Sequence, residues 1–389
     1  MDKLRESRWR LWPLLIALII LLAGALVVLP WAAGPIGKGD FIGYWSSSRL
    51  LLQGRDPYGI SNLSNLQFQA YPERGYVIYT WNPPWLPVLL LPVAWLPFQS
   101  ATQIWILLNF IVMIVSGLAV WYGLTGNREL PAVAMATTAT IFFPPALAAI
   151  SAGQIIPWVY LASVAMVIWQ LRNQHLALAG VVLPVVLLKP QVTFLAVAFS
   201  LWHGVRNRQW RFLGAATASL MGLLTIATVL YPGWLASYLN NIGGRSMMLW
   251  LTPTLGGILF ALWPLPWIRY IGLLLVLMVP ILYSRARQYP PWLVLGLVLG
   301  AGVAVSPFGW SFDQIVLLPL ILYMIDAQRR LKHWWLGWGL LAIYLIPLML
   351  HVIQVDELSY VWVSWLTLAL YIGVMRTKPQ APWSAAVIS

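Results

Sequence analysis

The residues that could do chemistry gather in a long polar stretch, from about 32 to 82, which follows an apolar run ending at Trp31. Asp40 lies near its start, in a glycine-rich turn. A carboxylate at this position lies near the membrane interface, where a charge is expensive and usually functional. It can equally be the N-cap of a helix over 41–52. If that helix forms, Tyr44 lies one turn beyond Asp40 on the same face.

Lys189 is a second residue of interest, because it lies between two long apolar runs. An ammonium group there is costly without an anionic partner. A phosphate or a carboxylate would supply that partner, and a lysine that snorkels with its stem in lipid is the alternative. Asp313 has three open roles: N-cap of a helix, partner of Lys189, or second catalytic carboxylate. Asp56 precedes Pro57 and indicates a structural turn.

The elements that position these residues must be membrane helices. Of 389 residues, 61% are hydrophobic and only 8% are charged, whereas a soluble domain has about 25% charged residues. This excludes a soluble enzyme. The net charge of +13 is not gathered into a basic face, so no nucleic-acid partner is expected. The chain has no cysteine and four scattered histidines, so we expect no metal and no cofactor.

Hydropathy predicts an all-α, polytopic bundle of about 12 transmembrane helices, since each crossing needs roughly 20 mostly apolar residues. We expect one domain over 1–389, with short interfacial helices in the outer loop, where leucines at 50–52 would rest on the membrane surface. Segments 83–98 and 251–264 are expected to enter and return, and 176–203 to form a hairpin with Lys189 at its outer tip. The apolar runs are 11–31, 83–98, 101–123, 131–149, 155–171, 176–188, 190–203, 212–231, 251–264, 266–284, 291–305, 313–326, 334–351 and 359–375.

The basic residues predict the orientation, because cytoplasmic loops carry the excess of lysine and arginine. They place both termini inside, the loop 32–82 outside and the tail 376–389 in the cytoplasm of a multi-pass cell-membrane protein. The basic clusters used are at 3–10, 206–211, 285–287, 329–332 and 376–378, with Arg128 and Arg172. Asp40, Asp56, Glu73, Asp313, Asp356 and Glu357 then fall outside.

Several short motifs follow one another in order along most of the chain. They are Gly39-Asp40-Phe41 with Tyr44, Gly54 with Pro57-Tyr58, Tyr79-Thr80 with Asn82-Pro83-Pro84, Leu91-Pro92 with Leu96-Pro97, Gly153-Gln154, Lys189-Pro190, Ser306-Pro307 and Asp313-Gln314. As an ordered set they resemble glycosyltransferase family 87, within the C-type membrane glycosyltransferases.

The resemblance implies an inverting, metal-independent transferase that uses a polyprenyl-phosphate sugar, often mannose, at the outer face. The acceptor would be a lipid-linked or envelope glycan. Asp40 would be the general base, and Lys189 or Arg245 would stabilise the leaving phosphate. Some relatives carry a histidine beside the segment that corresponds to Ser306-Pro307. This chain lacks it, so Asp313 or Gln314 would take that role.

The expected substrate-binding residues come from the outer loop and from the outer helix ends. They are Tyr44, Arg49, Tyr58, Tyr79, Asn82, Gln154, Lys189, Gln191, Arg245, Asp313, Gln314 and His351. Two other functions stay open: a transporter or flippase of an amphipathic substrate, and a structural subunit of an envelope assembly. The chain shows no inverted repeat of the kind common in transporters, and its acids gather on one face, which favours the enzyme. The oligomeric state is open.

Overall fold

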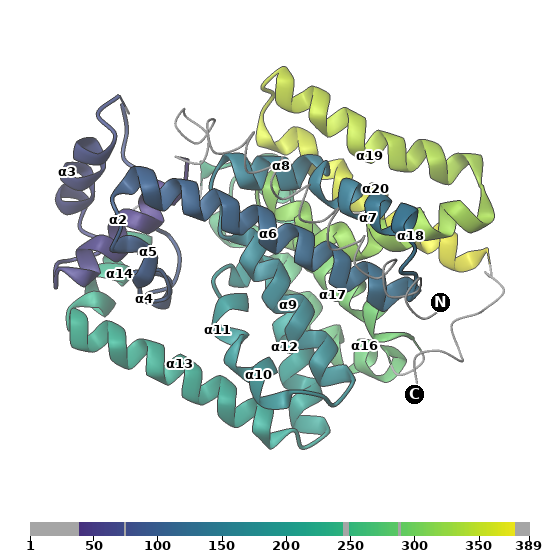
Figure 1. Ribbon diagram of the computed structural model, residues 1–389, viewed down its shortest axis with the longest axis horizontal. Coiled ribbons are helices and arrows are strands. Elements are labelled where there is room, and N and C mark those ends of the chain that lie inside the picture. The colour runs from purple at the N-terminus through teal and green to yellow at the C-terminus, as the bar shows by residue number, and fades with distance from the viewer. Residues whose placement is uncertain (1–38, 74, 244–248, 287–288, 378–389) are drawn as a thin grey trace, which may run out of the picture.

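The computed structural model describes residues 39–377, except 74, 244–248 and 287–288. The expected first span at 11–31 and the tail from 378 onward lie outside the described residues. Within the described ranges the regular structure is entirely helical, with no strand (Figure 1). The all-α prediction is therefore confirmed for this part of the chain.

Many of the helices begin at a proline, which lacks the N–H that the first turn would leave unpaired. Pro144, Pro190 and Pro291 are examples. In chain order the helices are α2 (Phe41–Leu52), α3 (Ile60–Ala70), α4 (Trp85–Leu89), α5 (Leu91–Ala94), α6 (Phe98–Thr125), α7 (Leu130–Ile141), α8 (Pro144–Ser151), α9 (Ile156–Leu171), α10 (Leu176–Val181), α11 (Leu183–Val186), α12 (Pro190–Arg206), α13 (Trp210–Leu230), α14 (Trp234–Gly243), α15 (Leu255–Leu262), η2 (Pro266–Met278), α16 (Val279–Ala286), α17 (Pro291–Val305), η3 (Ser311–Leu317), α18 (Leu318–Leu331), α19 (Trp334–Val352), η4 (Glu357–Tyr360) and α20 (Val361–Arg376).

Six helices among the described residues are long and apolar enough to cross a membrane. The pair α7 and α8, bent by 57°, makes a seventh if it is one span, and α9, α10–α11 and α17 are shorter apolar helices. The chain is thus a multi-pass membrane protein, and the count of about 12 crossings stays a prediction. Segments 83–98 and 251–264 consist mainly of short helices, and their entry and return stay a prediction.

The helices run between two ends of different chemistry. At the first, which we call the acidic end, the turns at Asp40 and Gln154 meet and Lys189 meets Asp313. At the second, the basic end, Gln209 after α12 bonds to the carbonyl of Gln170 at the end of α9. Helices α10 and α11 lead from the basic end to Lys189, and α12 leads away from it; the outer position of Lys189 stays a prediction.

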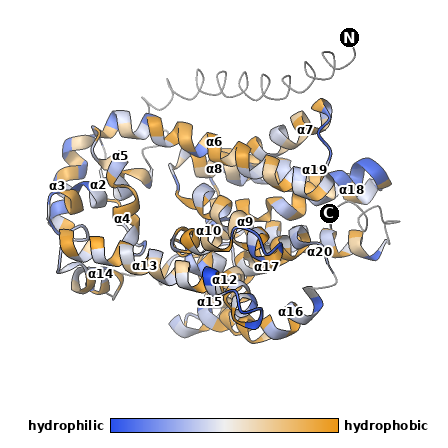
Figure 2. Cartoon of the chain, turned by 60° about the horizontal axis from the view of Figure 1, so that its bottom comes forward, coloured by the Kyte–Doolittle hydropathy of each residue, from blue (hydrophilic) through white to orange (hydrophobic). Residues whose placement is uncertain are grey.

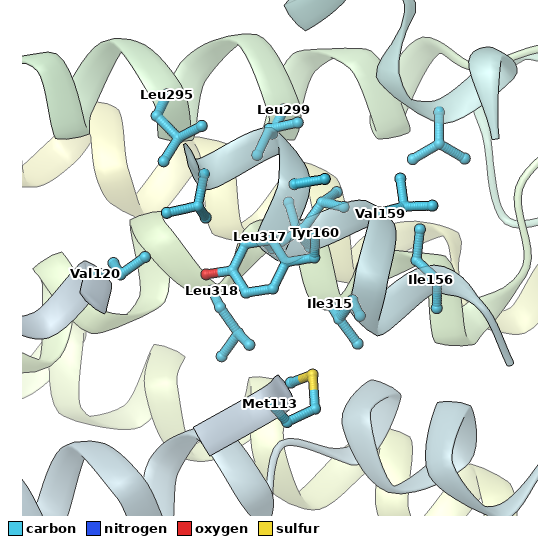
Figure 3. Packing of buried hydrophobic residues seen from close by; sticks show 14 of the residues in the cluster. Met113, Val120, Ile156, Val159, Tyr160, Leu295, Leu299, Ile315, Leu317 and Leu318 are labelled. Atoms are coloured by element: carbon cyan, nitrogen blue, oxygen red, sulfur yellow. The ribbon is translucent and has the colours of Figure 1, made fainter. Parts of the chain in front are cut away.

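The core lies where α6, α9, α17 and the η3–α18 segment pack together (Figure 3). Tyr160 of α9 is buried among Met113, Leu299 and Leu318 of the three neighbouring elements, and Figure 3 shows its ring at the centre of this group. Inside a membrane, helices associate through close packing rather than through exclusion of water. This core fixes the end of α9 that carries Gln154.

Helices α13 and α19 lie on opposite flanks of the molecule (Figure 1), and both are rich in apolar residues (Figure 2). Only 11% of the most apolar window of α13 and 17% of that of α19 is buried. Apolar surface of this extent, formed by whole helices, suits contact with lipid. The flanks therefore agree with a membrane location.

Helix α2 is enclosed by protein, contrary to the prediction that its leucines rest on the membrane surface. Leu50 is 0% and Leu51 1% exposed, and Leu51 packs against Val88 of α4 and Ala227 of α13. The sequence could not show this, because the covering helices come from distant parts of the chain. Burial on nearly every side holds the start of α2, and with it Asp40, in a fixed position.

Candidate functional site

Asp40, Tyr44 and Gln154 form one hydrogen-bonded group at the acidic end. Gln154 Nε2 donates to Asp40 Oδ2, and Tyr44 Oη donates to Gln154 Oε1 at 3.0 Å. Asp40 occupies the N-cap position of α2, but its side chain makes no capping hydrogen bond. The N-cap alternative is therefore wrong for the carboxylate, which faces Gln154 instead.

The chemistry of the three groups determines the direction of both hydrogen bonds. An ionised carboxylate can only accept, so the amide must present its NH₂ to Asp40 and its oxygen to Tyr44. Burial raises the pKa of the Tyr44 phenol well above its usual value, and the charges of Asp40 and Asp313 raise it further. Tyr44 thus keeps its proton and stays a donor at neutral pH.

Gln154 lies in the turn between α8 and α9, which is held from two sides. Gly153 has φ +67°, a left-handed conformation that favours glycine. Its carbonyl accepts from Trp105 Nε1 at 2.8 Å, and the carbonyl of Gln154 accepts from Asn109 Nδ2 at 3.0 Å. Both donors belong to α6, so the position of the Gln154 amide depends on that helix.

The Asp40 turn is attached directly to the same α8–α9 turn. The backbone N–H of Asp40 donates to the carbonyl of Ala152 at 2.8 Å. A Cβ at Gly39 would lie 2.6 Å from that carbonyl oxygen, so only glycine permits this approach. The general-base candidate is therefore positioned by a backbone contact and by a side-chain contact to one turn.

Lys189 and Asp313 form a buried ion pair beside this group. Lys189 Nζ donates to Asp313 Oδ1 at 2.6 Å, with the two side chains 5% and 0% exposed. The snorkelling alternative for Lys189 is therefore wrong, and the carboxylate partner is Asp313. The lysine ammonium also lies 4.6 Å from the ring centroid of Phe312, a distance typical of a cation–π contact.

Asp313 is the third residue of η3 rather than its N-cap. Its Oδ2 accepts from the backbone N–H of Trp310, the N-cap residue, at 2.9 Å. Glu357, from the start of η4, accepts from the backbone N–H of Ser311 at 2.7 Å. Two carboxylates thus bind the first N–H groups of η3, where negative charge is favourable.

The remaining predicted residues fall into three groups by position. Asn82 and Gln191 lie next to the ion pair: Asn82 Nδ2 donates to the carbonyl of Leu188 at 2.9 Å, and the carbonyl of Gln191 accepts from Ser306 at 2.7 Å. Gln314 is buried beside Asp313 and donates to the carbonyl of Tyr360 at 3.0 Å. These three residues therefore lie next to the Lys189–Asp313 ion pair, either as neighbours in sequence or through hydrogen bonds to such neighbours.

The second group belongs to the structure of the outer loop. Arg49 donates to the carbonyls of Ala94 and Trp95 at the end of α5. Tyr58 is buried against Tyr238 of α14, and its N–H binds Asp56 Oδ1 at 2.9 Å in the expected turn. The ring of Tyr79 contacts that of Trp81 edge-on.

The third group consists of His351 and Arg245. His351 is exposed in the last turn of α19. Arg245 lies outside the described residues.

The sequence reasoning missed Arg269, which is 0% exposed in η2. Its guanidinium lies 5.0 Å from the ring centroid of Phe308 and donates to the carbonyl of Trp250 at 2.7 Å. Phe308 belongs to the loop that leads to Asp313, so Arg269 is a cation of the acidic end. The signal was available: a charge inside an apolar run is expensive and usually functional.

No group of three or more possible metal ligands occurs within the described residues. A model of glycosyltransferase family 87 matches residues 79–310. This range includes Asn82, Gln154 and Lys189, whereas Asp313 lies just after it and Asp40 well before it. Neither the curated proteins nor the solved structures gave a match.

Proposed function

The chain belongs to glycosyltransferase family 87, and on this premise we propose that it is an inverting transferase that uses a polyprenyl-phosphate sugar. The expected sugar is mannose, and the expected acceptor is a lipid-linked or envelope glycan at the outer face of the membrane. A lipid donor agrees with a chain whose candidate site lies at one end of a membrane bundle.

The proposed reaction is a single displacement at the anomeric carbon. The acceptor oxygen forms a new bond to that carbon as the bond to the phosphate oxygen breaks. Asp40 takes the proton of the acceptor hydroxyl as general base, and the polyprenyl phosphate leaves with the bonding electrons. Phosphate bears its negative charge well, so one carboxylate suffices, in contrast to the two used in glycoside hydrolysis.

The observation that carries the proposal is the orientation of the Asp40 carboxylate. Gln154 binds its Oδ2, and the capping role that would otherwise occupy the side chain is absent. A base must be held in a narrow range of orientations to act on a bound hydroxyl. The contacts of Gln154 to Tyr44 and to α6 supply that restraint.

The leaving phosphate needs a positive charge nearby. Lys189 and Arg269 are the buried cations of the acidic end in the described part of the chain. Lys189 is already compensated by Asp313, so it would contribute a hydrogen-bond donor more than a full charge. We therefore add Arg269 to Lys189 and Arg245 as a third candidate for the contact to the leaving phosphate.

Replacing Asp40 by asparagine tests the proposal, because it removes the base and keeps the shape. We expect transfer of labelled mannose from polyprenyl-phosphate mannose into the membrane glycan and lipid fraction to fall about 10²- to 10⁴-fold. Asp56→Asn is the matched control, since asparagine can still accept from the Tyr58 N–H. Equal transfer by the two variants would remove Asp40 from the mechanism.

A further inference from the structure

A cavity of about 270 Å³ lies at the basic end of the bundle, away from the candidate active site. It lies between α9, α12, α16 and α17. Leu171, Phe199 and Val294 give it apolar walls, and His203, Tyr283 and Tyr289 add an imidazole and two phenols. Cavities between the helices of a bundle, with a few polar groups on apolar walls, are common ligand sites.

The polar wall is built from packed rings. The His203 ring stacks on Phe199 with centroids 6.1 Å apart and meets the Tyr283 ring edge-on at 5.6 Å. Tyr283 Oη donates to Asn207 Oδ1 at 3.2 Å. These contacts join α12 to α16 and keep the aromatic wall in place.

The charged residues on the segments that form the cavity are all basic. The segments that form it, 156–175, 190–211 and 279–305, contain no aspartate and no glutamate. They carry exposed arginines: Arg172 follows Leu171, Arg206 lies one turn beyond His203, and Arg285 lies two residues beyond Tyr283. Asp326 of α18 is engaged by Arg330 at 2.8 Å and by Arg329 at 3.9 Å. The rim therefore suits an anion.

The surface beside the cavity is apolar and exposed. On α12, Trp202 is 44% and Val205 58% exposed, and on α16 Ile281 is 53% exposed. Side chains of this kind at the rim of a membrane bundle face acyl chains. A ligand of this cavity would thus have an anionic head close to arginines and a hydrocarbon part along α12 and α16.

We propose that the cavity binds the headgroup of an anionic diacyl phospholipid. Basic pockets between transmembrane helices recognise such headgroups, and the Tyr289 phenol and the His203 imidazole can donate to a phosphate ester. A zwitterionic lipid presents a cation to the same arginines and binds less well. The site is independent of the transferase proposal, since it lies at the opposite end of the bundle.

Lipid binding by the full chain, purified in detergent and delipidated, tests this. Native mass spectrometry would compare phosphatidylglycerol with phosphatidylcholine of identical acyl chains. We expect the wild type to bind phosphatidylglycerol at least tenfold more tightly. Arg206→Gln/Arg285→Gln should lose about 30-fold in affinity for it, since each basic residue near anionic lipid contributes roughly fivefold. Lys332→Gln/Arg376→Gln removes the same charge from the ends of α18 and α20, which contribute no residue to the cavity wall, and should bind as the wild type does.

Equal affinity for the two lipids would overturn the proposal, as would an equal loss in both double variants, which would indicate only general attraction to a basic surface. Soluble glycerol phosphate provides the last arm. If it displaces phosphatidylglycerol at matched concentration, the acyl chains are not recognised and the site is one for a free phosphate ester. The arginines are exposed, so neither double variant should impair folding, and the Val294→Phe variant, which narrows the cavity, should lower phosphatidylglycerol binding independently of charge.

Discussion

The side chain of Gln154 is the residue on which the candidate site depends most directly. A glutamine amide has a donor group and an acceptor oxygen, and here each has one partner. The NH₂ group donates to the Asp40 carboxylate, and the amide oxygen accepts from the Tyr44 hydroxyl. Glutamate in its place could keep only the contact to Tyr44. The amide therefore holds the carboxylate without adding charge to the site.

Gln154→Glu is expected to move the acidic limb of the pH–rate profile to higher pH. Two carboxylates in contact cannot both ionise easily, so the pKa of Asp40 would rise. The base acts only when deprotonated, so kcat/KM should fall most at low pH and recover as pH rises. Gln53→Glu adds the same charge at an exposed position and should leave the profile unchanged. A uniform loss at every pH would mean that Gln154 does not act through Asp40.

At the scale of elements, the turn before α2 and the turn between α8 and α9 are held together by close backbone approach. Gly39→Ala would bring a methyl group within 2.6 Å of the Ala152 oxygen, so the two turns must separate. We expect a loss of transfer of at least tenfold and a lower melting temperature, since local distortions of this kind cost about 1–3 kcal/mol.

Gly75→Ala is the matched control for that substitution, because nothing lies within 4 Å of an added Cβ there. Transfer rates and melting temperatures of both variants, measured in the same detergent, make the comparison. Unchanged transfer by Gly39→Ala would show that the two turns need not touch for activity.

The ion pair of Lys189 and Asp313 joins α12 to η3. Removing one partner leaves a buried charge, which costs about 3–5 kcal/mol, whereas removing both costs much less. We therefore expect Lys189→Met to be less stable than Lys189→Met/Asp313→Asn. Thermal unfolding of the single and double variants measures the coupling. Strictly additive losses would contradict a direct interaction between the two side chains.

The sequence predicted the all-helical class, because membrane helices must satisfy their own backbone groups and so form long apolar runs; six or seven candidate spans occur in the described residues, and the count of about 12 stays a prediction. It also named Asp40, Tyr44 and Gln154. It could not show that they meet, since Gln154 is 114 positions from Asp40. Asn109 and Arg269 went unnoticed because single polar residues inside apolar runs were taken as parts of spans. The enclosure of α2 depended on α13, which lies far along the chain.

For the whole molecule, the separation of charge is the feature that links fold to function. The acidic end holds Asp40 and the Lys189–Asp313 pair, and the basic end holds Arg172, Arg206 and Arg285. The two sets lie at opposite ends of shared helices: Lys189 precedes α12, and Arg206 is its last residue. In the proposed transfer from a membrane lipid, the sugar donor and the general base must meet at one surface of the membrane, and Asp40 lies at the acidic end.

This polarity predicts which side of the membrane each end faces. The natural chain has no cysteine, so a single introduced thiol can be labelled without background, and the unaltered chain is its own negative control. Ser61→Cys lies exposed on α3 near the acidic end, and Gln174→Cys lies exposed at the basic end. Because arginine-rich loops stay inside, a membrane-impermeant maleimide should label the Ser61→Cys variant in intact cells and the Gln174→Cys variant only after the membrane is opened. The reverse pattern would place Asp40 inside the cell and rule out an outer-face donor.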